Sequence, residues 1–111
     1  MAHNEFQLRV VLFWGECGHW VAQGLEFDIS AQGKTIPEAM DAFVDTVAGQ
    51  LMFDAERGVE PFEGFEVAPQ EFQRKWDEGF KAQPKAPRHI PDSIPVNFRV
   101  PLASPEVSIY A

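Results

Sequence analysis

Five carboxylates in the first half of the chain are the side chains best suited to chemistry. They are Glu26, Asp28, Glu38, Asp41 and Asp45. Carboxylates can hold the paired divalent ions of a nuclease when they converge on metal positions about 4 Å apart. The spacing of the last three places them on one solvated side of a helix, and the strand predicted over residues 6–14 contains no carboxylate. Hydrolysis of nucleic acid is therefore an alternative that the spacing does not favour.

Cys17 and His19 form a second candidate group, a C-x-H pair next to Glu16. A zinc site needs three or four ligands, and the chain offers no second cysteine and no paired histidine to complete one. Nucleophilic catalysis by Cys17 needs a base, an orienting group and an oxyanion hole, and no pattern identifies these together. We therefore predict no catalytic residue, no metal site and no cofactor.

An aromatic stripe forms a third candidate. Phe72, Trp76 and Phe80 recur at four-residue steps in a short helix predicted over residues 69–81. The stripe either forms a groove or knob for a partner protein or packs on the sheet or the first helix. Aromatic stripes at helical spacing mostly belong to the core, which favours packing. The three residues remain candidates for partner contact.

Three short strands and a long helix must position these side chains. Alternating apolar residues predict a strand over 6–14, a glycine-bounded hairpin loop over 15–18, and further strands over 19–23 and about 27–31. The expected fold class is α+β, with a small antiparallel meander packed on a long helix. A second short helix and an extended, proline-rich C-terminal tail complete the chain.

The long helix is predicted over about residues 36–56. Thr35 and Glu38 have the spacing of a capping box, in which each side chain bonds the backbone N–H of the other residue. Gly58 is a natural stop, and Gly49 inside the helix costs about 1 kcal/mol relative to alanine, so something packs close there. Because the apolar stripe faces the sheet, Glu38, Asp41 and Asp45 line the opposite side and are candidates for partner binding.

The tail over residues 84–111 differs in composition from the domain over 1–83, because six of the nine prolines fall in it. Val96, Phe98 and Val100 alternate with polar residues, which predicts an edge strand over 96–100 with three subunit-contact candidates on one face. Residues 107–110 are a possible second extended segment. The tail either docks on its own sheet or crosses to another subunit, and on this basis we predict a homodimer or larger assembly.

The overall charge limits the choice of partner. The formal net charge is −8, and clustered lysine and arginine, which phosphate binding requires, are missing, so DNA binding is not expected. An acidic chain suits a basic protein partner, although acidity also simply provides solubility. One cysteine fits a reducing compartment, and no apolar run is long enough to cross a membrane, so we predict a cytoplasmic protein without a membrane partner.

The order of these elements resembles the HicB-type antitoxin domain. That family shows an apolar strand, a turn, a W-V-A segment, a second short strand, and Q-G-x-T-x-x-E-A opening a long helix. The W-V-A segment corresponds to residues 20–22, and the helix entry corresponds to Gln32, Gly33, Thr35, Glu38 and Ala39. The resemblance covers residues 6–57. It departs at residues 24–28, where the family has a proline-glycine element, and in the absence of a C-terminal DNA-binding segment.

The resemblance implies a truncated RNase H-like fold and a non-enzymatic function. HicB-type domains neutralise a small basic mRNA-cleaving toxin by covering its active surface. In RNase H enzymes an aspartate on the first strand is central, and residues 6–14 have none. We therefore expect a protein-binding domain with a small basic toxin as its possible partner. The alternatives are a stand-alone homo-oligomeric binding or regulatory domain, and a nucleic-acid hydrolase of degenerate RNase H type.

Overall fold

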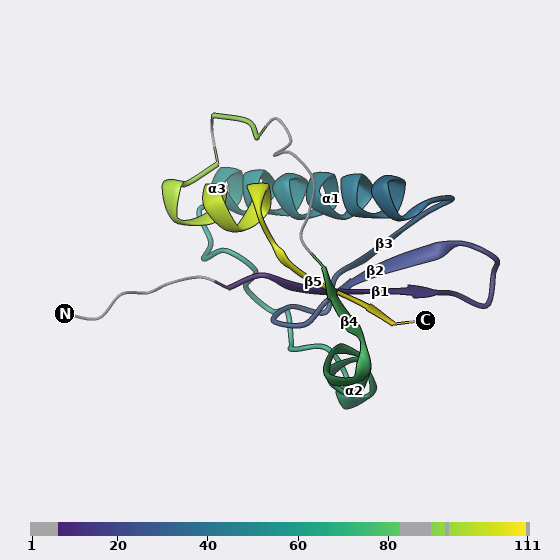
Figure 1. Ribbon diagram of the computed structural model, residues 1–111. Coiled ribbons are helices and arrows are strands. Elements are labelled where there is room, and N and C mark those ends of the chain that lie inside the picture. The colour runs from purple at the N-terminus through teal and green to yellow at the C-terminus, as the bar shows by residue number, and fades with distance from the viewer. Residues whose placement is uncertain (1–6, 83–89, 93, 111) are drawn as a thin grey trace.

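The computed structural model describes residues 7–82, 90–92 and 94–110. Within these ranges the chain forms an α+β fold with a five-stranded mixed sheet and three helices (Figure 1). The elements, in chain order, are β1 (Arg9–Trp14), β2 (Trp20–Gly24), β3 (Ser30–Gly33), α1 (Ile36–Arg57), α2 (Gln70–Glu78), β4 (Phe80–Ala82), α3 (Val96–Ala103) and β5 (Glu106–Tyr110). None of the helices in the described part of the chain is long and apolar enough to span a bilayer.

The sheet has the strand order β3-β2-β1-β5-β4. Strands β1, β2 and β3 form the expected antiparallel meander, with Leu12 opposite Ala22 and Ala22 opposite Ala31. The last strand, β5, runs parallel to β1, with Val10 opposite Val107, and β4 pairs antiparallel with the far side of β5. Strand β5 therefore lies inside the sheet, between β1 and β4. The predicted homo-oligomer stays a prediction.

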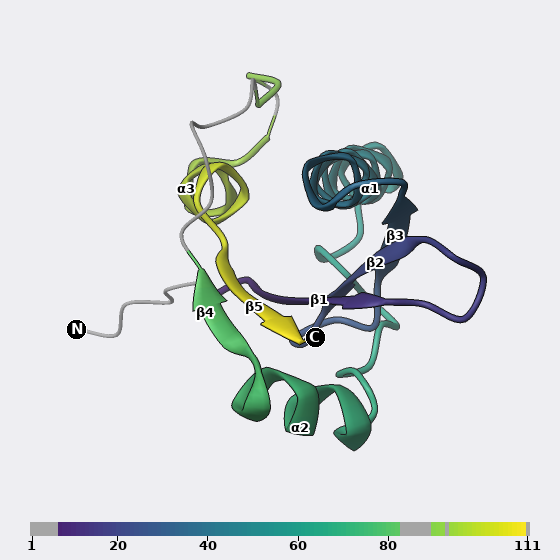
Figure 2. The same cartoon turned by 45° about the vertical axis from the view of Figure 1, so that its right-hand side comes forward.

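Helices cover both faces of this sheet. Helices α1 and α3 lie on one face and α2 lies on the other (Figure 2). The two burial patterns of β1 explain this arrangement, because Val10 and Leu12 join the core under α1 and α3, whereas Val11 packs with Trp76 of α2. Val10 and Val11 are both fully buried. A strand that is apolar on both faces needs a helical layer on each side.

The long helix α1 begins and ends close to where the sequence predicts. The Thr35 hydroxyl accepts a hydrogen bond of 3.2 Å from the Glu38 N–H, and Gly58 adopts the left-handed conformation that ends the helix (φ 68°). One detail of the predicted capping box is wrong, because the Glu38 carboxylate accepts from the Lys34 N–H and not from that of Thr35. Gly33 precedes the cap because a Cβ atom there would overlap the backbone nitrogen of Ala39.

Several element boundaries differ from the sequence-based expectation. The first strand begins at Arg9, after Gln7 and Leu8, and its predicted start at residue 6 lies outside the described residues. The third strand begins at Ser30 and not near residue 27, because residues 24–29 form a tight loop. In that loop the Gly24 N–H donates to the Ile29 carbonyl at 2.8 Å, and the Gln23 amide donates to Asp28 at 3.0 Å. The second helix was predicted to reach Lys81, but α2 ends at Glu78 and Phe80 starts β4.

The largest correction concerns the tail. Residues 96–100 were predicted as an edge strand, but they form helix α3. In a helix the three predicted subunit-contact residues cannot share a face, so Phe98 is buried (7% exposed) while Val96 and Val100 are 82% and 73% exposed. The apolar residues Ile90, Ile94, Phe98 and Leu102 recur every four positions and all are buried. The observed structure follows the four-residue spacing of these buried residues and not the two-residue alternation of Val96, Phe98 and Val100.

The connection between α1 and α2 is held by a buried carboxylate. Asp54 is 2% exposed, and its Oδ2 accepts a 2.8 Å hydrogen bond from the Phe62 N–H. Phe62 has a positive φ of 59°, which is uncommon for a non-glycine residue, and its ring stacks on Phe27 and meets Phe98 edge-on. The Asp54 side chain thus anchors the loop that contains Phe62, and the Phe62 ring packs into the core.

The helix cap at Thr35 yields a stability prediction. We expect Thr35→Ala to lower the free energy of unfolding by about 1 kcal/mol, because the Glu38 N–H loses its acceptor. The measurement is urea denaturation followed by circular dichroism. Thr46→Ala is the matched control, since its hydroxyl only bonds the Ala42 carbonyl within an exposed turn of the same helix. Equal midpoints for the two variants would contradict the cap.

Helix α3 yields a second prediction. We expect Phe98→Ala to cost about 3–5 kcal/mol of unfolding free energy. The substitutions Val96→Ala and Val100→Ala should each change it by less than about 0.5 kcal/mol, because both side chains face solvent. Denaturant unfolding of the three variants checks this. Similar losses at all three positions would instead favour a strand with one buried face.

Candidate functional site

The outward face of α1 is the candidate site that the structure supports best. The helix lies on the sheet with its apolar side, and its opposite side is covered by no other element of the described chain (Figures 1 and 2). Glu38, Asp41 and Asp45 all lie exposed on that opposite side, as the spacing predicts. At 1.5 Å per residue the three carboxylates follow the helix over about 10 Å. They present a row of negative charge beside the N-terminal half of α1.

The same face changes character toward the C-terminal end of α1. Gly49 is exposed there, and Met52 and Phe53 are 39% and 53% exposed. The guanidinium carbon of Arg57 lies 5.1 Å from the centre of the Phe53 ring, a cation–π distance. Glu56 is exposed one turn after Met52. We call the residues Glu38, Asp41, Asp45, Gly49, Met52, Phe53 and Glu56 the outer α1 face.

The aromatic stripe predicted on α2 does not form a continuous surface. Trp76 is buried (8% exposed) against Val11 and Leu25, and the Phe72 ring stacks on Phe13 with centroids 5.6 Å apart. Phe80 lies beyond the helix on β4 and is 73% exposed. Of the three partner-contact candidates, Phe80 alone is mostly accessible. The side chains of Phe72 and Trp76 instead fasten α2 to the sheet.

The C-terminal end of α2 is tied to the sheet by two polar side chains. The Lys81 ammonium donates to the Trp76 carbonyl at 2.6 Å, and the Ser108 hydroxyl donates to the same carbonyl at 3.0 Å. The Tyr110 oxygen, which accepts a hydrogen bond from the Arg74 guanidinium, and the charge of Glu78 raise the pKa of Arg74 above its usual value. The hydrogen bonds from Lys81 and Ser108 satisfy the Trp76 carbonyl, which the end of the helix otherwise leaves without a partner.

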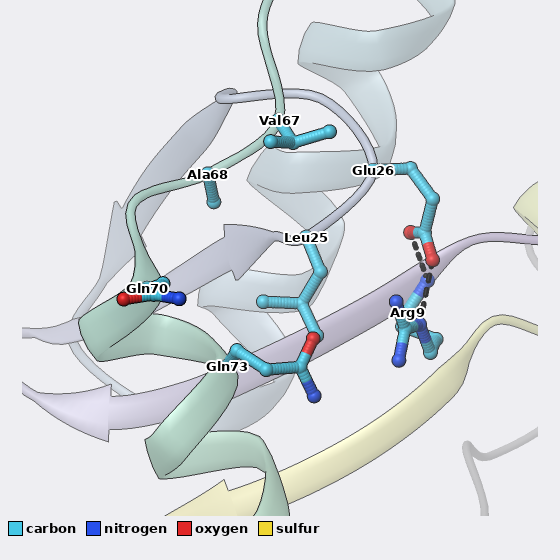
Figure 3. A pocket seen from close by; sticks show the side chains of 7 residues that line it. All are labelled: Arg9, Leu25, Glu26, Val67, Ala68, Gln70 and Gln73. Atoms are coloured by element: carbon cyan, nitrogen blue, oxygen red, sulfur yellow. Dashed lines mark hydrogen bonds and ion pairs between the residues drawn. The ribbon is translucent and has the colours of Figure 1, made fainter.

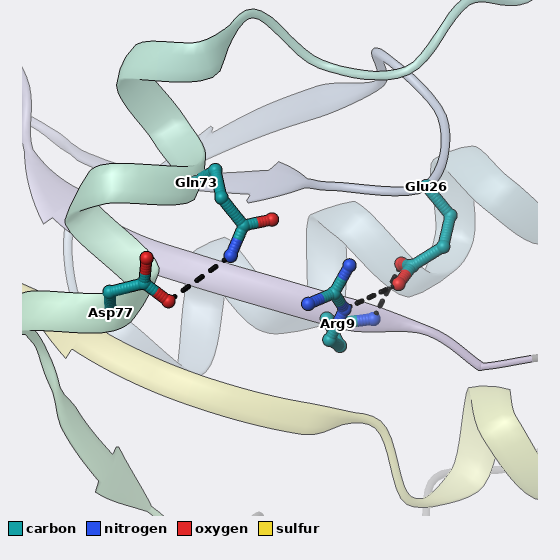
Figure 4. Close-up of polar contacts among 4 residues, drawn as sticks. All are labelled: Arg9, Glu26, Gln73 and Asp77. Carbon is teal, nitrogen blue, oxygen red and sulfur yellow. Dashed lines mark hydrogen bonds and ion pairs between the residues drawn. The ribbon is translucent and has the colours of Figure 1, made fainter.

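A cleft of about 390 Å³ lies between α2 and the loop after β2 (Figure 3). Its charged lining residues, Arg9 and Glu26, pair with each other, through Arg9 Nε at 2.6 Å from Glu26 Oε2 and the Arg9 N–H at 2.8 Å from Glu26 Oε1 (Figure 4). The Gln73 amide donates to Asp77 at 3.2 Å. The apolar part of the lining comes from Leu25, Val67 and Ala68, and the two charged groups of the cleft are already paired with each other.

The hairpin loop borders a second cleft, of about 550 Å³, between the β1–β2 hairpin and α2. Cys17, His19 and Glu16 line it together with Phe13 and Phe72. The His19 Nδ1 atom is buried and has no hydrogen-bond partner in the described chain, and Cys17 is exposed. Among the residues that the structure describes, no three histidine, cysteine or acidic side chains are placed to share a metal ion.

The five carboxylates considered for nuclease chemistry do not converge. Glu26 lies on the α2 side of the sheet with both oxygens bonded to Arg9. Asp28 accepts from Gln23 in the loop before β3. The helical carboxylates are exposed on α1, which lies on the other side of the sheet from α2 (Figure 2). The structure therefore separates these groups by a layer of secondary structure, which is incompatible with one shared pair of metal ions.

Sequence reasoning missed two residues that matter for these surfaces. Asp54 occupies a position in line with Val47 and Leu51 on the apolar stripe of α1, and a carboxylate at a core position was a signal of a buried polar anchor. The Arg9–Glu26 pair had no comparable signal, because seventeen residues separate the partners. No protein-family model, no curated protein and no solved structure matches this chain.

The separation of the carboxylates predicts that the purified chain cleaves neither RNA nor DNA in Mg²⁺ or Mn²⁺. Labelled single- and double-stranded substrates incubated with the chain and analysed on denaturing gels provide the measurement. The control is the Asp28→Asn variant prepared in parallel, which separates intrinsic activity from a copurifying nuclease. Cleavage by the original chain that disappears in Asp28→Asn would contradict the prediction.

Proposed function

We propose that this chain is a HicB-like protein-binding domain that neutralises a small basic toxin by covering the active surface of that toxin. The observation that carries the proposal is the outer α1 face, where Glu38, Asp41 and Asp45 are exposed in one row. Two further points support it. The helix entry of this face has the Q-G-x-T-x-x-E-A pattern on which the resemblance rests, and the whole chain has a net charge of −8.

Electrostatics explains how such a face would act. A basic RNA-cleaving protein needs positive charge to bind its phosphate substrate, so a row of carboxylates competes for the same side chains. Attraction between a chain of net charge −8 and a basic partner also accelerates encounter at low ionic strength. In this mechanism the domain needs no catalytic group, because it excludes RNA by occupying the surface that binds it.

The position of the acidic row suits this task mechanically. Its helix is anchored at both ends, by the Thr35 cap and by the left-handed Gly58, and along its length by buried side chains such as Phe43 and Leu51. A rigid helix loses little conformational freedom on binding, so more of the interaction energy appears as affinity. Of the three carboxylates, that of Glu38 also serves the fold, because it accepts from the Lys34 N–H at the helix entry.

The first experiment examines the reading frames next to the gene for this chain, where we expect the partner to be encoded. We expect a small, strongly basic protein there that arrests growth when expressed alone, and we expect coexpression of this chain to restore growth. The two purified proteins should form a complex by isothermal titration calorimetry. A neighbouring basic protein that neither binds nor is neutralised would overturn the proposal.

A charge-removal pair then tests the face. We expect Asp41→Asn combined with Asp45→Asn to weaken binding about tenfold at low salt, with a smaller effect at high salt where charges are screened. Glu71→Gln combined with Asp77→Asn is the matched control, because it removes the same charge from α2 on the opposite side of the sheet. Equal losses for both pairs would mean that only net charge matters and that α1 is not the contact.

A further inference from the structure

Gly49 occupies an unexpected position in the middle of α1. Glycine is among the least favourable residues for a helix interior, and it is usually retained for a positive φ or for close packing. Neither reason applies here. Gly49 is not among the glycines with positive φ, and a Cβ atom built at this position meets no atom within 4 Å beyond the adjoining residues and backbone of its own helix. The described chain therefore gives no internal reason for glycine at residue 49, and the expectation that another part of the fold packs close is wrong.

Gly49 leaves a position without a side chain on the exposed side of α1, which we call the notch. Residues three and four positions apart lie side by side on a helix, so Asp45, Met52 and Phe53 border the position that has no side chain. Met52 and Phe53 are both substantially exposed, and Asp45 continues the acidic row toward the N-terminus. The notch thus has a charged rim on one side and an apolar rim on the other.

Charge decides what kind of molecule fits this surface. A second copy of the chain would bring another acidic face, with its own Glu38, Asp41 and Asp45, against the first, and like charges in close contact are destabilising. A nucleic acid would meet the same repulsion from its phosphates. A protein segment that combines positive side chains with an apolar side chain complements both halves of the face.

We infer that the notch at Gly49 is the point where a basic protein partner makes its closest approach to α1. An apolar side chain or the backbone of the partner enters the notch between Asp45, Met52 and Phe53, and its lysine or arginine side chains lie along Asp41 and Glu38. Any side chain at residue 49 would fill this notch. The inference rests on the proposed function and adds the location and chemistry of the contact.

The test separates the stability of the helix from access to its surface. Gly49→Ala should raise the thermal midpoint by about 2–6 °C, because alanine favours the helix and has open space around it. Gly49→Met should also fold, yet it should weaken binding of the basic protein encoded beside this chain by at least tenfold in calorimetry. A stabilised domain with impaired binding is the expected signature.

Ala55→Met is the matched control, because residue 55 is exposed on the same helix but lies about a third of a turn away from the notch. Its affinity should stay within about twofold of that of the original chain. If Gly49→Met binds as tightly as Ala55→Met, the contact inferred here is wrong while the proposed function stands. If the original chain does not bind the basic protein at all, the proposed function and this contact both fail.

Discussion

The central strand β1 is buried on both faces, and the other elements of the structure are arranged around that constraint. Val10 and Val11 point to opposite sides of the sheet and are both fully buried. Strand β1 also needs a hydrogen-bonding partner on each edge, and it finds β2 on one side and β5 on the other. Because β5 is the last element of the chain, the two ends of the sequence depend on each other.

This dependence explains the role of the elements between β1 and β5. A parallel pair of strands requires a long crossover connection, and here the whole region from β2 to α3 supplies it. Helix α2 covers the outer face through Trp76 and Phe72, and α3 covers the inner face through Phe98 and Leu102. The tail that composition sets apart therefore supplies buried residues to the same core.

The surface left over is where the proposed function resides. The apolar side of α1 packs on the sheet, so its other side faces solvent. The residues on that other side determine what this face of the domain can bind. Residues 41, 45 and 49 lie exposed on α1 and outside the buried core. A binding surface of this kind can be altered by substitution without loss of the scaffold, which is why the proposed variants at residues 41, 45 and 49 are informative.

Local patterns in the sequence were sufficient for the first half of the domain. The three- and four-residue spacing of the apolar stripe and the Thr35 cap identified α1 almost to the residue, and the alternation of apolar residues identified the first strand but not its start at Arg9. The same spacing placed Glu38, Asp41 and Asp45 on the exposed side of the helix, because helical periodicity alone determines which side chains share a face.

Tertiary structure decided what depends on contacts distant in sequence. The alternation of Val96, Phe98 and Val100 is equally compatible with a strand, and only the core into which Ile94, Phe98 and Leu102 pack selects the helix. The insertion of β5 beside β1 and the Arg9–Glu26 pair depend on residues that are far apart along the chain. The open space around Gly49 likewise could not be read from the sequence, since it is a property of what the folded chain leaves uncovered.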